Sequence, residues 1–246
     1  MVAATFTPLD ENGDVNLSVI DKYADWIAST PIKGVFVCGT TGEFSSLAID
    51  ERKLILEKWL VSARKRFKVI AHVGSNCQRS AMELARHAAQ VGADAIASIA
   101  PSFFKPGTVD ELVDFFAPIC HSAAGLPFYY YNMPSITGVN LPVDKFLVEG
   151  KKKIPNLVGT KFTHNNLMEM GVCIELEQHR FEVLHGYDEI LISGLAMGAV
   201  AGVGSTYNYI PNVYQAIFDS MKMNDLETAR HNQIKSIRTV EVIIKY

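Results

Sequence analysis

The stretch Asn156-Leu-Val-Gly-Thr-Lys-Phe-Thr163 combines a short apolar run with a lysine, Lys161, near its end. Pro155 precedes the run and polar residues follow it, so the pattern predicts a buried strand that meets a loop. An amine in an apolar pocket favours its neutral form, which is a nucleophile towards carbonyl carbon. Taken alone, the stretch favours a plainer interpretation, a strand-end lysine that snorkels to solvent or pairs with a carboxylate. The rest of the chain decides between this interpretation and a nucleophile.

Eight short β-type runs recur along the chain, and amphipathic helical patterns separate most of them. Strict alternation of strand and helix implies a parallel sheet, because parallel neighbours need a crossover connection. Eight such units in 246 residues favour a closed (β/α)8 barrel, a TIM barrel, over an open doubly wound sheet. The predicted strands are Val2–Phe6, Gly34–Cys38, Lys68–His72, Ala93–Ile99, Pro127–Tyr131, Leu157–Phe162, Phe181–His185 and Ala199–Val203.

A single domain over residues 1–246 is the economical interpretation, because no linker rich in proline, glycine or serine divides the chain. We expect the barrel to occupy about residues 1–223 and an additional C-terminal helix to occupy about residues 225–246.

The composition limits the kinds of partner that the protein can bind and the cellular compartment that suits it. A net charge of -3 and a pI near 6.2 argue against nucleic acid or an anionic membrane as a partner. Four scattered cysteines without a Cys-x-x-Cys motif predict a reduced, cytoplasmic protein. The seven histidines show no His-Glu-x-x-His spacing, so we predict no metal.

In an α/β barrel the chemistry sits on loops after the C-terminal ends of the strands, and the unusual residues of this chain fall there. Gly39-Thr-Thr-Gly-Glu43 follows the second strand, and its glycines and hydroxyls suit an anion such as a carboxylate. Tyr129-Tyr-Tyr-Asn-Met-Pro134 spans the end of the fifth strand and offers a tyrosine that could relay a proton. We expect at least one of its three tyrosines to pack in the core.

Two further motifs follow the seventh and eighth strands. Gly186-Tyr-Asp-Glu189 places adjacent carboxylates where they could bind a polyol or cap the next helix. Gly202-Val-Gly-Ser-Thr206 lacks the third glycine of a dinucleotide fingerprint, so we predict no nucleotide site. His72 and His185 end strands and are expected to be core histidines without a catalytic role. A lysine nucleophile, an anion cradle and a tyrosine together fit a Schiff-base enzyme acting on a 2-oxo acid.

These motifs, in combination, resemble those of the N-acetylneuraminate lyase and dihydrodipicolinate synthase superfamily, from Val2 to about Tyr209. The resemblance implies a (β/α)8 barrel, usually a homotetramer, that binds pyruvate as an imine on the lysine of strand six. No metal or organic cofactor takes part in that chemistry. The resemblance assigns imine formation to Lys161, proton transfer to Tyr131, and the pyruvate carboxylate to Thr40 and Thr41.

The lyase branch of the superfamily fits better than the synthase branch. Synthases carry an arginine shortly after the Tyr-Asn-x-Pro motif, where this chain has Ile136, and a tyrosine from a neighbouring subunit, where this chain has Phe104. The resemblance therefore implies reversible cleavage of N-acetylneuraminate, a sialic acid, to pyruvate and N-acetyl-D-mannosamine. In that branch the sugar hydroxyls would contact Thr163, Gly186, Asp188, Glu189, Gly204 and Ser205.

Three alternatives stay open at this point. Dihydrodipicolinate synthase is one, although Ile136 argues against it, and a 2-keto-3-deoxy-sugar aldolase is the second. Family members usually continue past the C-terminal end of this sequence, so we expect a shortened set of C-terminal helices. The third alternative is accordingly a truncated, inactive barrel that binds 2-oxo acids or partner subunits.

Overall fold

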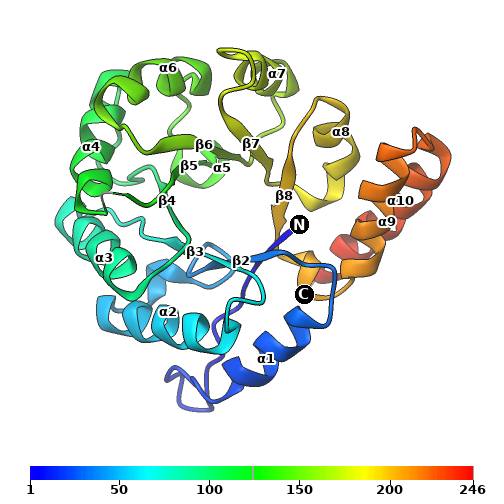
Figure 1. The fold of residues 1–246 in the computed structure, drawn as a ribbon, viewed down its shortest axis with the longest axis horizontal. Helices are drawn as coiled ribbons and strands as arrows, with labels where there is room; N and C mark the ends of the chain where they lie inside the picture. The colour runs from blue at the N-terminus through cyan, green and yellow to red at the C-terminus, as the bar shows by residue number, and fades with distance from the viewer. Residues whose placement is uncertain (124, 246) are drawn as a thin grey trace.

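Eight parallel strands close into a barrel in the order of the sequence (Figure 1). The computed structural model describes residues 1–123 and 125–245. The strands are β1 (Val2–Ala4), β2 (Gly34–Val37), β3 (Lys68–His72), β4 (Ala95–Ile99), β5 (Phe128–Asn132), β6 (Leu157–Phe162), β7 (Glu182–His185) and β8 (Ala201–Gly204). The (β/α)8 barrel predicted from the alternation of strands and helices is confirmed.

The observed strand ends lie within two residues of the predicted ones, and β3 and β6 match the prediction throughout. The largest differences arise where hydrogen bonds to the neighbouring strand continue beyond the last residue of the observed strand. β1 ends at Ala4 rather than Phe6, yet the Thr5 amide still donates to the Phe36 carbonyl at 3.2 Å. Strand ends defined by pairing and by sequence pattern therefore differ by a residue or two without any change of topology.

Helices surround the barrel and carry the chain from each strand to the next (Figure 1). They are α1 (Val19–Ala28), α2 (Ile49–Ala63), α3 (Gln78–Val91), α4 (Val109–Ser122), α5 (Pro134–Thr137), α6 (Val143–Lys153), α7 (Leu167–Glu175), α8 (Leu191–Ala196), α9 (Pro211–Lys222) and α10 (Leu226–Ile243). Short 3-10 helices are η1 (Phe44–Ser46), η2 (Asp188–Ile190) and η3 (Thr206–Asn208). No helix within residues 1–123 and 125–245 is long and apolar enough to cross a membrane.

The last two helices, α9 and α10, lie side by side outside β8 (Figure 1). The helix expected at about residues 225–246 is α10, which runs from Leu226 to Ile243. Tyr246, the last residue of that expected range, lies outside the described residues.

Strand side chains alternate between the barrel interior and the layer beneath the helices. On β2, Phe36 belongs to the interior cluster, whereas Val35 and Val37 belong to the larger cluster under the helices. The interior cluster comprises Phe36, Ile70, Ala95, Ala97, Ile99, Tyr131, Leu184 and Val203. Fully buried aromatic residues such as Trp59 and Phe116 fill the outer layer, so two apolar layers fix the strands from both sides.

The register of the barrel brings Lys161 on β6 beside Tyr131 on β5. Gly159, two residues earlier, lets β6 approach β7 closely, because a Cβ at this position would overlap the backbone of Glu182. Alternation along β6 then turns the Lys161 side chain to the interior, on the same side as Tyr131. The stretch that carries the lysine is thus held in register by a close contact between backbones.

Candidate active site

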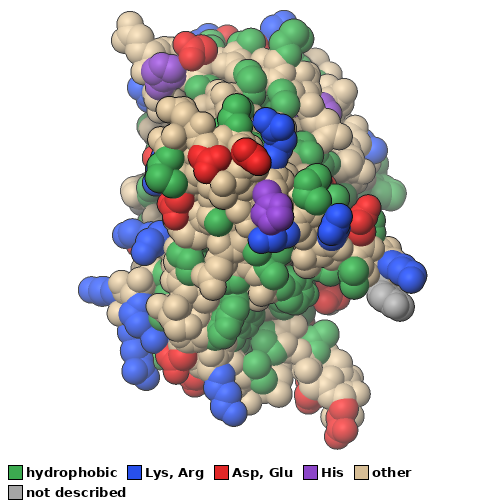
Figure 2. Space-filling view, turned by 90° about the vertical axis from the view of Figure 1, so that its right-hand side faces the viewer, with side chains coloured by type: hydrophobic (Ala, Val, Ile, Leu, Met, Phe, Trp, Pro, Cys, Tyr) green, Lys and Arg blue, Asp and Glu red, His purple; other side chains and the backbone are tan. Residues whose placement is uncertain are grey.

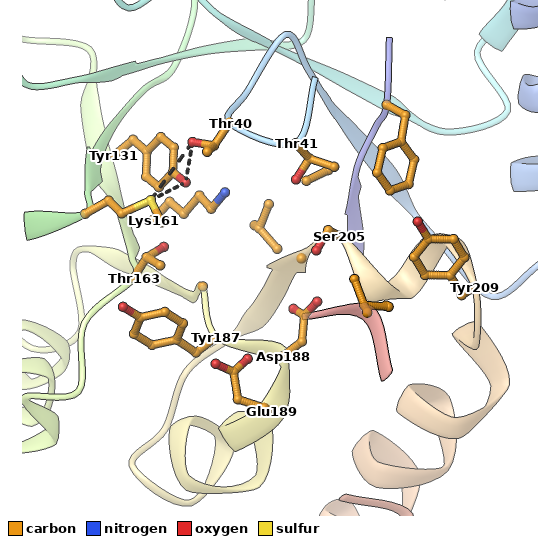
Figure 3. A pocket seen from close by; sticks show the side chains of 17 residues that line it. Thr40, Thr41, Tyr131, Lys161, Thr163, Tyr187, Asp188, Glu189, Ser205 and Tyr209 are labelled. Carbon is orange, nitrogen blue, oxygen red and sulfur yellow. Dashed lines mark hydrogen bonds between the residues drawn. The ribbon is translucent and has the colours of Figure 1, made fainter. Parts of the chain in front are cut away.

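A cavity of about 390 Å³ lies at the C-terminal ends of the strands, and every residue predicted for the site lines it (Figure 3). These predicted residues are Thr40, Thr41, Tyr131, Lys161, Thr163, Gly186, Asp188, Glu189, Gly204 and Ser205. The volume falls within the range of about 300–1,000 Å³ that is common for small-molecule sites. The topology therefore gathers, from the ends of five separate strands, residues that lie as far as 165 positions apart in the sequence.

Lys161 is buried, at 4% exposure, and its amine points into the cavity (Figure 3). The Nζ atom lies 4.0 Å from the centre of the Tyr131 ring and 4.5 Å from that of Phe36. None of the ion pairs formed by residues 1–123 and 125–245 involves Lys161. The interpretation of Lys161 as a lysine paired with a carboxylate is therefore wrong for the described part of the chain, and its amine is directed at whatever occupies the cavity.

Tyr131 faces Thr40 across the cavity, and their hydroxyl oxygens lie 3.2 Å apart (Figure 3). The Tyr131 hydroxyl also donates to the Met133 sulfur at 3.0 Å. Its neighbour Tyr130 points the other way and is fully buried in the outer layer, as expected for at least one of the three tyrosines. A phenol hydrogen-bonded to a hydroxyl beside an amine can pass a proton to or from a bound molecule.

The loop after β2 leaves the strand at Cys38, whose φ of 54° lies in the left-handed region. His72 holds this point: its Nδ1–H donates to the Cys38 carbonyl at 2.8 Å. Arg52, itself buried, donates to the His72 carbonyl at 2.7 Å. Burial lowers the pKa of His72 well below its ordinary value, so the ring is neutral and its Nδ1 proton is available for this bond. His72 is thus a core histidine that fixes the loop carrying Thr40 and Thr41.

On the opposite side of the cavity, Asp188 is buried at 5% exposure. Its Oδ2 atom accepts hydrogen bonds from the Thr206 amide at 2.9 Å and the Thr206 hydroxyl at 2.7 Å. Its Oδ1 atom has no partner among the described residues. Burial raises the pKa of Asp188 to about 6, against the lowering effect of the Thr206 bonds. The Oδ1 atom lies against Gly204 at the wall of the cavity, so Asp188 keeps an unused hydrogen-bond acceptor there.

Two glycines of the predicted site make room for the polar side chains. A Cβ on Gly204 would overlap the Asp188 carboxylate, and one on Gly186 would overlap the Thr163 side chain. The Thr163 hydroxyl, like Asp188 Oδ1, is buried without a partner among the described residues. The family resemblance implies that these glycines contact the sugar, and the structure adds that they allow Thr163 and Asp188 to take their positions.

Seven residues that line the cavity were not predicted: Ala4, Phe6, Met133, Tyr187, Val203, Tyr209 and Ile243. Tyr187 lies inside the motif Gly186-Tyr-Asp-Glu189, and its hydroxyl is 3.4 Å from Ser135 across the rim. Tyr187 lies between Gly186 and Asp188, which were both predicted, so the sequence could have indicated that Tyr187 also lines the site. Ile243 comes from the far end of α10, and no local pattern in the sequence links it to the strand ends.

The fold and this cavity define a (β/α)8-barrel enzyme with a lysine at the centre of its site. The chain belongs to the dihydrodipicolinate synthetase family, whose model matches residues 1–245. The superfamily expected from the motifs is therefore confirmed.

Individual relatives lie in the lyase branch of that family. The chain is 42% identical over 248 aligned positions to the N-acetylneuraminate lyase of Mus musculus, covering 100% of this chain and 78% of that protein. The structure of Proteus mirabilis N-acetylneuraminate lyase matches with a TM-score of 0.97 at 35% identity, covering 100% of this chain and 83% of that one. That of the Aliivibrio salmonicida lyase (sialic acid aldolase) matches with a TM-score of 0.97 at 37% identity, covering 100% and 81%.

The packing of Gly204 against Asp188 predicts the effect of one added methyl group. Gly204→Ala should lower the free energy of unfolding by about 1–3 kcal/mol, because the buried carboxylate must move away from its Thr206 donors. Gly107→Ala is the matched control, since a Cβ there meets only Glu111 at 3.6 Å, and it should change stability by less than about 0.5 kcal/mol. Urea unfolding of both variants measures the difference, and equal midpoints would contradict the prediction.

Proposed function

We propose that this protein is a class I aldolase that cleaves N-acetylneuraminate reversibly to pyruvate and N-acetyl-D-mannosamine through a Schiff base on Lys161. The observation that carries the proposal is the division of one cavity into two chemically different halves. An amine, a phenol and two threonine hydroxyls lie on β6, β5 and the loop after β2. Carboxylates, hydroxyls and close-packed glycines lie after β6, β7 and β8.

The first half suits a 2-oxo acid. Lys161 attacks the C2 ketone of the open-chain substrate, and loss of water gives an imine between C2 and the lysine nitrogen. The hydroxyls of Thr40 and Thr41 lie beside the amine, where they can donate to the carboxylate next to that carbon (Figure 3). Imine formation makes C2 an electron sink, so the bond between C3 and C4 can break.

Tyr131 is the proposed proton carrier for that step. Its oxygen accepts the C4 hydroxyl proton, while its own proton moves towards Thr40 or the substrate carboxylate. Breaking the C3–C4 bond gives N-acetyl-D-mannosamine and an enamine on Lys161. Protonation of C3 and hydrolysis of the imine release pyruvate and restore the amine. The cycle uses only side chains and substrate, so it needs no metal or organic cofactor.

The second half suits a neutral polyol rather than a second carboxylate. Its charged side chains are two acids, Asp188 and Glu189, and Lys161 is the sole cation among the described residues that line the cavity. Acids accept hydrogen bonds from hydroxyls but repel a carboxylate. Ile136, where a synthase carries an arginine, is 53% exposed and supplies no positive charge. These features favour the sugar lyase over dihydrodipicolinate synthase.

Lys161→Ala and Tyr131→Phe should separate the two chemical roles. Lys161→Ala should reduce pyruvate release from N-acetylneuraminate to background, because no other described residue that lines the cavity carries an amine. Tyr131→Phe should slow turnover about 10²–10⁴-fold, because only the proton transfer is lost. A coupled assay for pyruvate measures both variants, with 2-keto-3-deoxygluconate as the competing substrate. Activity of Lys161→Ala near that of the wild type would overturn the mechanism, and preference for the competing substrate would overturn the sugar assignment.

The raised pKa of Asp188 predicts a pH dependence of sugar binding. An ionised carboxylate accepts hydroxyl hydrogen bonds best, so affinity should fall as the pH drops through about 6 and Asp188 gains a proton. The KM for N-acetylneuraminate should rise about tenfold between pH 7 and pH 5, and Asp188→Asn should show a high KM with little pH dependence. Steady-state kinetics over this range provide the measurement. The same pH dependence in Asp188→Asn would assign it to another group, such as Glu189.

We also propose a cytoplasmic location and assembly as a homotetramer, as the family resemblance implies. All four cysteines are free thiols, which suits a reducing compartment. Exposed apolar side chains support self-association: Phe103 and Phe104 after β4 are 76% and 87% exposed, and Met168 on α7 is 78% exposed.

Assembly is tested by the mass of the protein in solution. Sedimentation equilibrium should give about four times the chain mass of 27.1 kDa. A monomer at micromolar concentration would contradict the proposal, and a dimer would restrict association to one of the two apolar regions.

A further inference from the structure

The side chain of Gln233 connects α10 to the loop that carries Asp188 and Glu189. Gln233 is 4% exposed and lies 45 residues beyond Asp188 in the sequence. Its Nε2 donates to the Asp188 carbonyl at 3.0 Å, and its Oε1 accepts the Ile192 amide proton at 2.8 Å. The two bonds hold the first residue of the short helix η2, Asp188–Ile190, and Ile192 at the start of α8, so one amide fixes both ends of this turn.

Further buried bonds connect the same amide to the Asp188 carboxylate. Gln233 Nε2 also donates to the Ser236 hydroxyl at 2.6 Å. Ser236 contacts the Tyr214 hydroxyl, and Tyr214 contacts the hydroxyl of Thr206. Thr206 in turn donates to Asp188 Oδ2. The backbone and the side chain of Asp188 are therefore held by one polar network that runs through α9 and α10.

This network lies behind one half of the cavity. The outer surface on the side of α9 and α10 carries apolar side chains among charged ones (Figure 2), whereas Gln233 and Ser236 are buried beneath it. Lys161 and Tyr131 lie on β6 and β5, and within residues 1–123 and 125–245 neither side chain forms a hydrogen bond with α10. A buried amide that satisfies a carbonyl and an amide of a binding loop restricts that loop to one conformation.

We propose that Gln233 is a positioning residue for the sugar half of the site, acting through Asp188 and Glu189 and leaving the pyruvate half unaffected. The inference rests on the proposed function, because the sugar and pyruvate halves are defined by it. Without Gln233 the buried Ile192 amide loses its side-chain acceptor, and the Asp188 carbonyl keeps only the bond from the Leu191 amide, so the turn must shift to satisfy these groups. A shift of this turn moves both acidic side chains that would bind the hydroxyls of the sugar.

The condensation direction tests this inference, because it gives separate KM values for pyruvate and N-acetyl-D-mannosamine. Gln233→Met keeps the volume and the helix propensity but removes both bonds to the turn. Asn232→Leu is the matched control: Asn232 is also buried on α10, but its amide donates to Thr228 of the same helix. Gln233→Glu is a second variant that retains an acceptor for Ile192 and loses the donor to Asp188. Circular dichroism establishes that each variant is folded.

We expect both Gln233 variants to raise the KM for N-acetyl-D-mannosamine about fivefold or more, with a change in the KM for pyruvate below about twofold. Asn232→Leu should change neither KM by more than about twofold. Equal changes in both KM values, or the same sugar-specific change in Asn232→Leu, would overturn the positioning role of Gln233. Loss of folding in both Gln233 variants, with Asn232→Leu folded, would make Gln233 a stability residue instead. A wild-type protein without condensation activity would overturn the proposed function itself.

Discussion

Burial of the Lys161 amine at the mouth of a closed barrel is the constraint on which the rest of the site depends. Burying an amine without a carboxylate partner costs folding free energy. Such amines are therefore found mainly at functional sites, where they take part in binding or catalysis. The barrel positions this amine by register: β6 lies tightly against β7 at Gly159, and alternation turns Lys161 towards the rings of Tyr131 and Phe36. Because these rings cover the sides of the Lys161 amine, the amine can reach a reacting molecule only from the cavity.

The opposite side of the cavity repeats this arrangement with the charges reversed. Asp188 is buried with one oxygen satisfied by Thr206 and the other without a donor among the described residues. Gly204 provides the space for it, and Gln233 fixes its backbone from α10. Within residues 1–123 and 125–245, the site has an amine without an ion-pair partner at one end and an incompletely paired carboxylate at the other. Such a site favours a substrate with a carbonyl at one end and hydroxyls at the other.

Much of this arrangement was predictable from the sequence, and the parts that were not share a physical reason. Strand patterns and motifs at strand ends are local, so the barrel and all the predicted lining residues could be placed from them. The roles of Gln233 and Ile243 depend on where α10 packs, and no local periodicity encodes the packing of one helix against a distant turn.

The most direct test of the account is a crystal structure of the protein soaked in pyruvate and reduced with borohydride. The account predicts continuous density from Lys161 Nζ to C2 of the pyruvyl group, with its carboxylate against Thr40 and Thr41 and its methyl group towards Asp188. Unmodified Lys161, or an adduct on another lysine, would contradict the central claim that the barrel buries this amine in order to form an imine.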